Sequence, residues 1–262
     1  MQRTPFHLVE FSPWPLTACL SALFLTVGTA SWMHGFRPTL VLVGLLVAVL
    51  TAIVWWRDVI REGMFQGSHT AKVMTGLRQG MILFILSEVV FFAAFFWGFF
   101  HRAMGPAVEL GSCWPPVGVV GLDAFSIPLL NTVVLLSSAV RVTWAHHSLL
   151  AQDKNGVVWG LVVTLVLGAY FTYLQATEYI GSFFTISDGV YGSCFYVATG
   201  FHGLHVLIGR AFIFVCLVRA IFDGFSDAHH VGMERAAWYW HFVDVVWLFL
   251  FTFVYWWAGR GA

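Results

Sequence analysis

Long apolar segments separated by short polar connections run along the whole chain. Seven can be delimited, at residues 14–33, 39–60, 75–101, 127–147, 157–179, 190–218 and 236–258. A helix of about 20 residues spans the roughly 30 Å hydrocarbon core of a bilayer, because each residue adds about 1.5 Å. The pattern therefore predicts an all-α polytopic membrane protein with seven transmembrane helices.

Local signals agree with these boundaries. Pro13, Pro15, Pro38 and Pro128 stand at segment starts, where the missing N–H of proline costs least. Ser187 and Asp188 are expected to cap the N-terminus of the sixth helix. The third and sixth segments exceed the length that a perpendicular crossing needs, so they are predicted to tilt or to extend beyond the membrane.

The basic residues predict the orientation of the chain. If the N-terminus defines side one, the connections on that side hold ten basic residues: Arg3, Arg57, Arg61, Lys72, Arg78, Arg141, Lys154, Arg210, Arg219 and Arg235. Side two holds only Arg37, Arg102 and Arg260. Because basic residues gather on the inner side of a membrane, the N-terminus is predicted to face the matrix or cytoplasm, and the C-terminus the opposite side.

Composition supports a membrane protein and excludes other classes. The 262 residues are 59% hydrophobic and 10% charged, against about 25% charged in soluble domains. Net charge is zero and there is no basic run, so no nucleic-acid partner is expected. Four cysteines stand singly without a CxxC motif. The first residues carry no apolar core before their prolines, so no cleavable targeting peptide is evident. Either the chain is made inside its own compartment or a presequence has already been removed.

Glu88 is the one acidic residue in the apolar stretch 81–101. An ionised carboxylate near the middle of a membrane span costs on the order of 2–4 kcal/mol. The carboxyl is therefore expected to be protonated, paired, or turned toward protein or lipid headgroups. We expect it to be neutral at pH 7 and to be the lone buried acid of the bundle.

Eleven histidines offer a second set of candidate chemistry. His202 and His205 lie three residues apart, as do His241 and Asp244, and His146 and His147 end the fourth segment. Such residues can ligate haem or a metal, relay protons, form hydrogen bonds between helices, or anchor the chain at lipid headgroups. Two alternative functions for the protein follow from these residues. One is a proton-coupled carrier using Glu88, His241 and Asp244, and the other is a haem-binding membrane cytochrome.

The stretch 55–72, WWRDVIREGMFQGSHTAK, has a composition suited to lipid phosphate. Two tryptophans precede Arg57 and Arg61, which are one helical turn apart, and His69 and Lys72 follow. Cations beside aromatic rings at membrane depth favour an anionic headgroup. An ordinary basic flank of a membrane helix would give the same pattern, so both interpretations stay open.

Six longer motifs together resemble subunit III of the haem–copper cytochrome c oxidases, in order and over about residues 13–257. They are WWRDVIRE (55–62), LRQGMILFILSEVVFFAAFFWGFFH (77–101), VTWAHHSLL (142–150), FTISDGVYGS (184–193), ATGFHGLHVLIG (198–209) and WYWHFVDVVWLFLF (238–251). The start HLVEFSPWP and the WWRDV and FTISDG blocks are more similar to the mitochondrial branch.

The resemblance implies a fold and a role. The fold would be a two-helix bundle, residues 1–66, and a five-helix bundle, residues 67–262, around a V-shaped cleft filled with phospholipid. The chain would be a non-redox core subunit of complex IV in the mitochondrial inner membrane, supporting electron transfer from cytochrome c to oxygen and proton pumping. Haem a and copper would belong to subunits I and II. Further partners would be accessory subunits and, in some assemblies, other respiratory complexes.

The resemblance also implies site residues. Glu88 matches the family's carbodiimide-reactive intramembrane glutamate. Contacts to phosphatidylglycerol, phosphatidylethanolamine or cardiolipin carry over to Trp56, Arg61, Glu62, His69, Glu88, His205 and Arg219. No metal ligand and no catalytic residue are implied. Arg141, Arg210 and Arg235 depart from the family pattern, which has small residues there. We expect Arg141 and Arg210 each to meet a lipid phosphate, a carboxylate or a neighbouring subunit, and Arg235 to lie at the inner interface.

Overall fold

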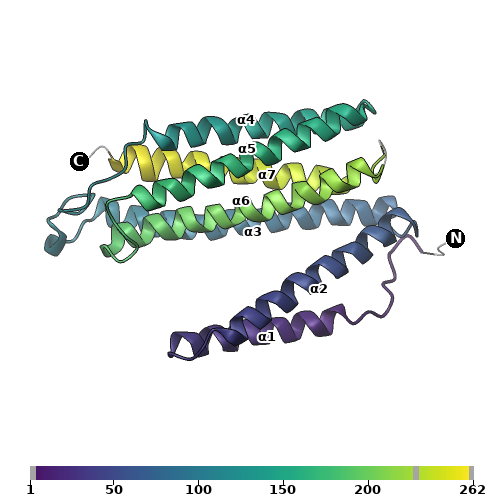
Figure 1. The fold of residues 1–262 in the computed structure, drawn as a ribbon, viewed down its shortest axis with the longest axis horizontal. Coiled ribbons are helices and arrows are strands. Elements are labelled where there is room, and N and C mark those ends of the chain that lie inside the picture. The colour runs from purple at the N-terminus through teal and green to yellow at the C-terminus, as the bar shows by residue number, and fades with distance from the viewer. Residues whose placement is uncertain (1–3, 227–229, 260–262) are drawn as a thin grey trace. The chain divides into compact units, whose positions relative to one another are not determined.

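A computed structural model describes residues 4–226 and 230–259 and contains helices and no strand in that part of the chain (Figure 1). The helices are α1 (Trp14–Met33), α2 (Thr39–Met64), α3 (Ala71–Met104), α4 (Ile127–Leu150), α5 (Lys154–Gly181), α6 (Gly189–Ile221) and α7 (Val231–Phe249). A π-helix, Leu250–Trp257, continues α7. All seven are long and apolar enough to cross a membrane, which confirms the predicted fold class.

The helices extend beyond several of the predicted apolar segments. The first segment, 14–33, coincides with α1, whereas α3 and α6 reach 34 and 33 residues. The added turns carry polar side chains such as Lys72, Arg102 and Arg219. A helix satisfies its backbone hydrogen bonds internally, so it continues into the headgroup region where hydropathy no longer marks it. Hydropathy therefore located the spans but underestimated their length.

The cap predicted for the sixth helix has a different geometry. Asp188 is the residue before the first turn of α6, but its side chain makes no capping bond. Its Oδ2 instead accepts a hydrogen bond from the backbone N–H of Thr185 at 2.6 Å. The predicted cap is therefore wrong in its bonding, because the carboxylate closes the preceding turn rather than the helix.

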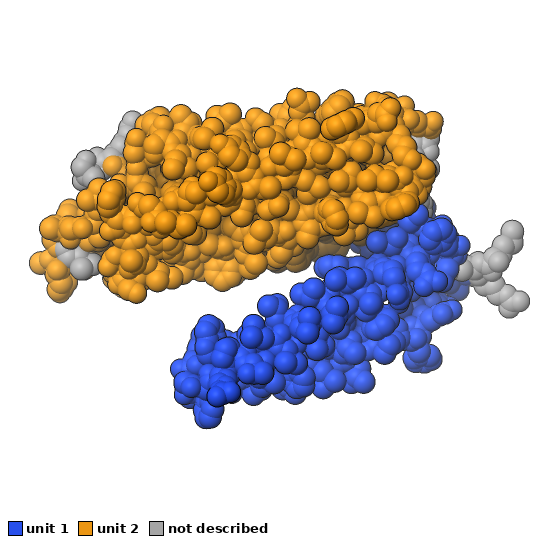
Figure 2. Space-filling view, in the orientation of Figure 1, with its two compact units in different colours: residues 1–77 blue, residues 78–262 orange. Residues whose placement is uncertain are grey.

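The chain divides into two compact units, residues 1–77 and 78–262, with the boundary inside α3 (Figure 2). The division that the resemblance implies, after residue 66, stays a prediction. In the first unit α1 and α2 form an antiparallel hairpin. A Cβ at Gly44 would lie 2.8 Å from the backbone nitrogen of Leu25, so the two helices touch backbone to backbone at this glycine.

In the second unit, α4, α5, α6 and α7 pack in a ring, α4 on α5, α5 on α6, α6 on α7 and α7 on α4. A stripe of small side chains on α5, Gly156, Gly160 and Thr164, is buried against α4. Such stripes let membrane helices approach closely, where dispersion contacts replace the missing hydrophobic driving force. Buried Trp240 and Trp247 of α7 donate indole hydrogen bonds to Ser138 and Thr132 of α4.

Aromatic rings hold α3 against this ring of helices. Its face carries Phe91, Phe92, Phe96 and Phe100, which contact rings of α6, α7 and the π-helix with centroids 5.1–6.1 Å apart. At one end Arg78 Nε donates to Glu234 of α7 at 2.8 Å. Offset and edge-to-face ring pairs add about 0.5–1.5 kcal/mol each beyond their area, so these contacts fix α3 in register.

Candidate functional site

Glu88 of α3 is paired with His205 of α6. The carboxyl Oε2 lies 2.9 Å from His205 Nε2, and the side chains are 22% and 9% exposed. His205 Nδ1 lies 2.6 Å from the carbonyl oxygen of Phe201. Because a carbonyl oxygen only accepts hydrogen bonds, Nδ1 must carry its hydrogen. A single proton is therefore shared between Glu88 Oε2 and His205 Nε2, and the pair has no net charge in either arrangement.

Aromatic rings surround this pair. The centroids of Phe91, Phe92, Tyr239 and Phe242 lie 5.0–6.3 Å from that of His205. Rings of this kind supply few polar partners, so charge separation between the carboxyl and the imidazole would cost free energy. The aromatic environment is therefore compatible with the neutral Glu88 carboxyl that we expect from the sequence.

We expect infrared spectra of the native complex at pH 7 to contain the carbonyl stretch of a protonated Glu88. The band should vanish in Glu88→Gln, and His205→Phe should shift it, because the imidazole would no longer accept from the carboxyl. The exposed Glu109→Gln substitution should leave it unchanged. A carboxylate band that disappears in Glu88→Gln would show the ion pair instead.

The two histidines of the HxxH motif have different partners. Both are buried on one side of α6, as their spacing predicts. His202 Nε2 donates to the backbone carbonyl of Val243 at 3.1 Å, and its ring contacts Phe171 and Trp247. His205 instead faces α3. His202 therefore joins α6 to α7, and the two imidazoles do not converge on one ligand.

His241 and Asp244 lie together on α7. His241 Nδ1 is 3.8 Å from Asp244 Oδ2, and His241 Nε2 lies 3.0 Å from the hydroxyl of Thr143 on α4. Asp244 is 4% exposed, and neither carboxyl oxygen has a hydrogen-bond partner. Glu88 bonds His205 rather than either of these residues. The structure thus brings together two of the three residues that the proton-carrier alternative would use, His241 and Asp244, whereas Glu88 is paired with His205.

Three further histidines gather where α4 ends and α7 begins. The ring of His146 lies 6.1 Å from that of His147 and 5.5 Å from that of His230. Within residues 4–226 and 230–259, no three His, Cys, Asp or Glu side chains are arranged to hold a metal ion.

The predicted lipid residues of the first unit lie at the end of α2 and just beyond it. Trp56 is 68% exposed and Arg61 is also exposed. Glu62 Oε2 lies 3.7 Å from His7 Nε2, and the His7 ring is 6.0 Å from that of His69. This end of the unit presents a cation and an indole outward, which are the groups that bind phosphate headgroups.

Arg57 and Asp58 form an ion pair that the sequence reasoning missed. Arg57 donates to Asp58 Oδ1 at 2.9 and 3.0 Å, and the indole of Trp14 on α1 donates to Oδ2 at 2.7 Å. The positive charge of Arg57 is therefore neutralised within the chain, whereas no salt bridge is formed by Arg61 in the described residues. The WWRD motif offered a signal, because its aspartate directly follows the arginine.

Arg219 and Arg235 lie at the same end of the second unit as the Arg78–Glu234 ion pair. Arg219 donates to the carbonyl of Gly224 at 3.0 Å and stacks on Phe225 at 4.1 Å. Its buried Nε has no partner. Arg235, one turn after the start of α7, donates from Nε to the carbonyl of Val231 at 3.0 Å. These local bonds orient both guanidinium groups near the helix ends.

Arg141 and Arg210 lie within membrane-spanning helices rather than in connections. Arg210 of α6 donates to the hydroxyl of Thr172 on α5 at 3.3 Å, and its buried Nε has no partner. Arg141 of α4 is exposed, with its guanidinium 5.7 Å from the Trp144 ring. Neither meets a carboxylate in the described chain, so what each meets in the membrane stays a prediction.

A buried polar network around Glu178 corrects the expectation that Glu88 is the lone buried acid. Glu178 is 4% exposed and accepts from Tyr255 at 2.6 Å and from Gln175 at 3.1 Å. Asn131 of α4 donates to Gln175 at 3.3 Å. Asp244 is equally buried. Sequence reasoning missed Glu178 because it stands near the end of an apolar segment, although Gln175 three residues earlier marked a polar face.

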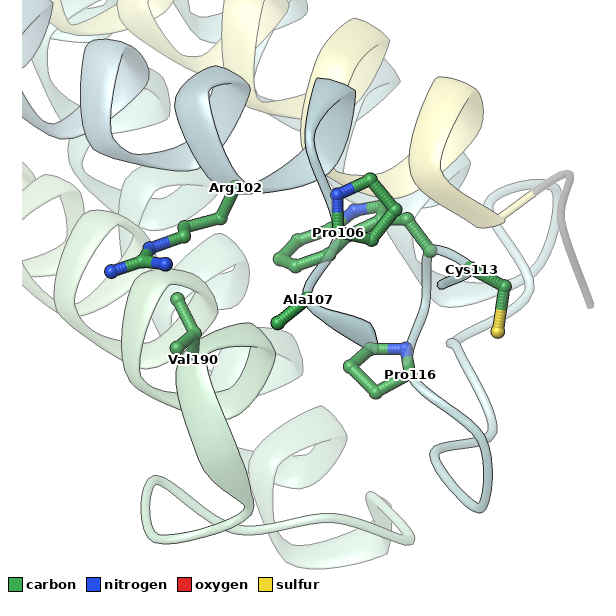
Figure 3. A pocket seen from close by; sticks show the side chains of 7 residues that line it. Arg102, Pro106, Ala107, Cys113, Pro116 and Val190 are labelled. Carbon is green, nitrogen blue, oxygen red and sulfur yellow. The ribbon is translucent and has the colours of Figure 1, made fainter. Parts of the chain in front are cut away.

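The loop after α3 encloses a hollow of about 20 Å³. Its lining comprises Arg102, Pro106, Ala107, Cys113, Trp114, Pro116 and Val190, with Arg102 and Val190 on one side and Cys113 and Pro116 on the other (Figure 3). A volume of this size holds about one water molecule. It is therefore too small for an organic substrate or a haem.

Comparison with known proteins gives a consistent result. The family model described as cytochrome c oxidase subunit III matches residues 4–259. A cytochrome c oxidase subunit 3 from Patiria pectinifera is 61% identical over 255 residues, which cover 97% of this chain and 98% of the relative. Those from Drosophila yakuba and Danio rerio are 58% and 57% identical, and each alignment covers at least 97% of both chains.

Proposed function

The chain belongs to the cytochrome c oxidase subunit III family, and from this premise we propose that it is a non-redox core subunit that holds phospholipids and stabilises subunit I. It is a subunit of complex IV, the cytochrome c oxidase of the respiratory chain. The proposed location is the mitochondrial inner membrane, which its seven spans cross. Subunits I and II, which would carry haem a and copper, are the proposed partners, together with accessory subunits.

The histidine contacts support a non-redox role. Both ring nitrogens of His205 have protein partners, Phe201 and Glu88. A haem or copper ion could take either nitrogen only by displacing one of these partners, because the ligating nitrogen needs its lone pair free. The proposal therefore leaves the redox centres to other subunits and gives these histidines a structural role.

The exposed Arg61 carries the lipid proposal. It lies one turn from Arg57, which Asp58 neutralises, and the same end of α2 carries the largely exposed indole of Trp56. An unneutralised guanidinium at a membrane surface attracts anionic headgroups by about 1 kcal/mol. In the other unit, Glu88, His205 and Arg219 are proposed to contact lipid as well. Phosphatidylglycerol, phosphatidylethanolamine or cardiolipin would satisfy the same phosphate chemistry.

The positions of the basic residues support the proposed orientation. Arg141 and Arg210 lie far from the ends of their membrane-spanning helices, so we leave them out of the count of basic residues near the helix ends. The remaining basic residues still favour the side that holds the N-terminus. We therefore place the N-terminus on the matrix side and the C-terminus on the intermembrane-space side.

Replacing Arg61 with glutamine should release anionic phospholipid from the purified oxidase. The loss of about 1 kcal/mol corresponds to roughly fivefold weaker retention. Quantitative lipid mass spectrometry, after washing the complex in a lipid-free detergent, measures the amount retained for each variant.

Arg57→Gln is the matched control, because the charge that it removes is already paired with Asp58. It should retain the lipid of the unchanged complex. Equal retention in Arg61→Gln and the unchanged complex would refute lipid binding at this residue.

A further inference from the structure

Arg141 places a positive charge near the middle of a membrane-spanning helix. It lies roughly nine residues, or about 14 Å, from Leu150 at the nearer end of α4. A guanidinium at that depth costs on the order of 2.5–3.5 kcal/mol unless it finds an acceptor. An arginine in this position therefore requires a partner.

The rest of the described chain does not supply one. The guanidinium has neither a hydrogen bond nor a salt bridge there, and its only contact is the Trp144 ring at 5.7 Å. A cation–π contact at an exposed site contributes about 0.5–1 kcal/mol, less than the cost of the charge. The apolar segment ends at about residue 147, six residues or about 9 Å beyond Arg141. An extended arginine side chain is shorter than this and the helix tilts it toward the N-terminus, so a carboxylate at the depth of Arg141 fits it better than a headgroup phosphate does.

The helix face around Arg141 is open to a neighbour. Val133, Ser137, Val140 and Trp144 share this face, and all of them are exposed. The hydroxyl of Ser137 donates to the carbonyl of Val133 at 2.6 Å, so it is not a free polar group. The face thus combines two valines and one small side chain, Ser137, with one indole and one cation that has no counter-charge in the described chain.

We propose that this face of α4 docks a transmembrane helix of a partner chain, whose aspartate or glutamate forms an ion pair with Arg141 at mid-membrane. Charge complementarity selects the occupant, because lipid tails carry no acceptor. A second copy of this chain does not fit. Its acids within the spans are Glu88, which is paired with His205, Asp244, which is 4% exposed, and Glu178, which is 4% exposed and lies near the end of α5. This interface goes beyond the proposed lipid-holding role.

Photo-cross-linking in the assembled oxidase tests the interface directly. A benzophenone amino acid at Val140, beside Arg141 on the exposed face, should cross-link to a membrane span of another chain. Peptide mass spectrometry should place an aspartate or glutamate within one helical turn of the cross-linked position. Arg141→Gln should weaken retention of that partner about thirtyfold, since it leaves a carboxylate without its counter-charge.

The matched control is Lys154→Gln, which removes a positive charge paired with Asp223 at the start of α5. It should leave the cross-link unchanged. Reversing both charges, with Arg141→Glu and the partner's acid replaced by lysine, should restore retention. Cross-links only to lipid, to a second copy, or to a span without an acid at that depth would each overturn the proposal. Because the chain would still co-purify with the oxidase, these outcomes would leave its family role intact.

Discussion

Replacing Gly160 with valine should force α4 and α5 apart and sharply lower the amount of assembled oxidase. A Cβ at Gly160 would lie 2.7 Å from the Cβ of Ala145 and 3.1 Å from the backbone oxygen of Arg141. Backbone cannot move aside as a long side chain can, so the two methyl groups of valine would add to this overlap. We expect a loss of about 3 kcal/mol, measured as a lower midpoint of thermal unfolding of the purified complex.

A glycine on α6 provides the control. A Cβ at Gly200 would meet no atom within 4 Å, so Gly200→Val adds the same volume in a helix without a collision. Its unfolding midpoint should stay close to that of the unchanged complex. If both variants unfolded at the same temperature, the close approach of α4 and α5 would not be a source of stability.

Replacing Glu178 with leucine should be the second most damaging change. Tyr255 and Gln175 donate to its Oε1. Without Glu178 the Tyr255 hydroxyl would lose its acceptor in an apolar interior, whereas Gln175 Nε2 also donates to the Tyr255 oxygen at 3.1 Å and would keep that bond. An unsatisfied buried polar group costs about 1–3 kcal/mol, so we expect a loss in this range. Thermal unfolding of the complex and the recovery of the chain after solubilisation measure this loss.

A double-mutant cycle with Tyr255→Phe separates the network from simple packing. Glu178→Leu should destabilise the complex by about 1–2 kcal/mol less in the Tyr255→Phe background, because this background has no Tyr255 hydroxyl to lose its acceptor. Glu178→Gln keeps an acceptor and should be milder than Glu178→Leu. The exposed Glu109→Leu is the control for loss of an acid. Strictly additive effects would mean that the hydrogen bond between Tyr255 and Glu178 adds little.

Much of the architecture followed from residue order alone. The first apolar segment ended where α1 ends, and all seven segments became helices. The three-residue spacings also predicted that His202 and His205 share a face of α6 and that His241 lies beside Asp244. These features are local, because hydropathy and helical periodicity act within one segment.

The partners of the polar residues could not be predicted in the same way. Nothing in the sequence stated that Glu88 would bond His205 rather than His241, or that Glu178 would bond Tyr255, which is 77 residues away. Asp188 had the right type and position for a cap, yet its carboxylate turned to Thr185. Such choices depend on which helix faces which, and this is settled only when all helices pack together.

The sequence by itself thus determined that this chain crosses a membrane, the number of its spans and the family it belongs to. Segment length, hydropathy and motif order depend only on the linear order of the residues. The tertiary structure decided which charges are neutralised. Asp58 neutralises Arg57, whereas Arg141 is exposed without a counter-charge in the described chain. The physical reason is that an ion pair requires two groups within about 4 Å, and only the packed helices set that distance.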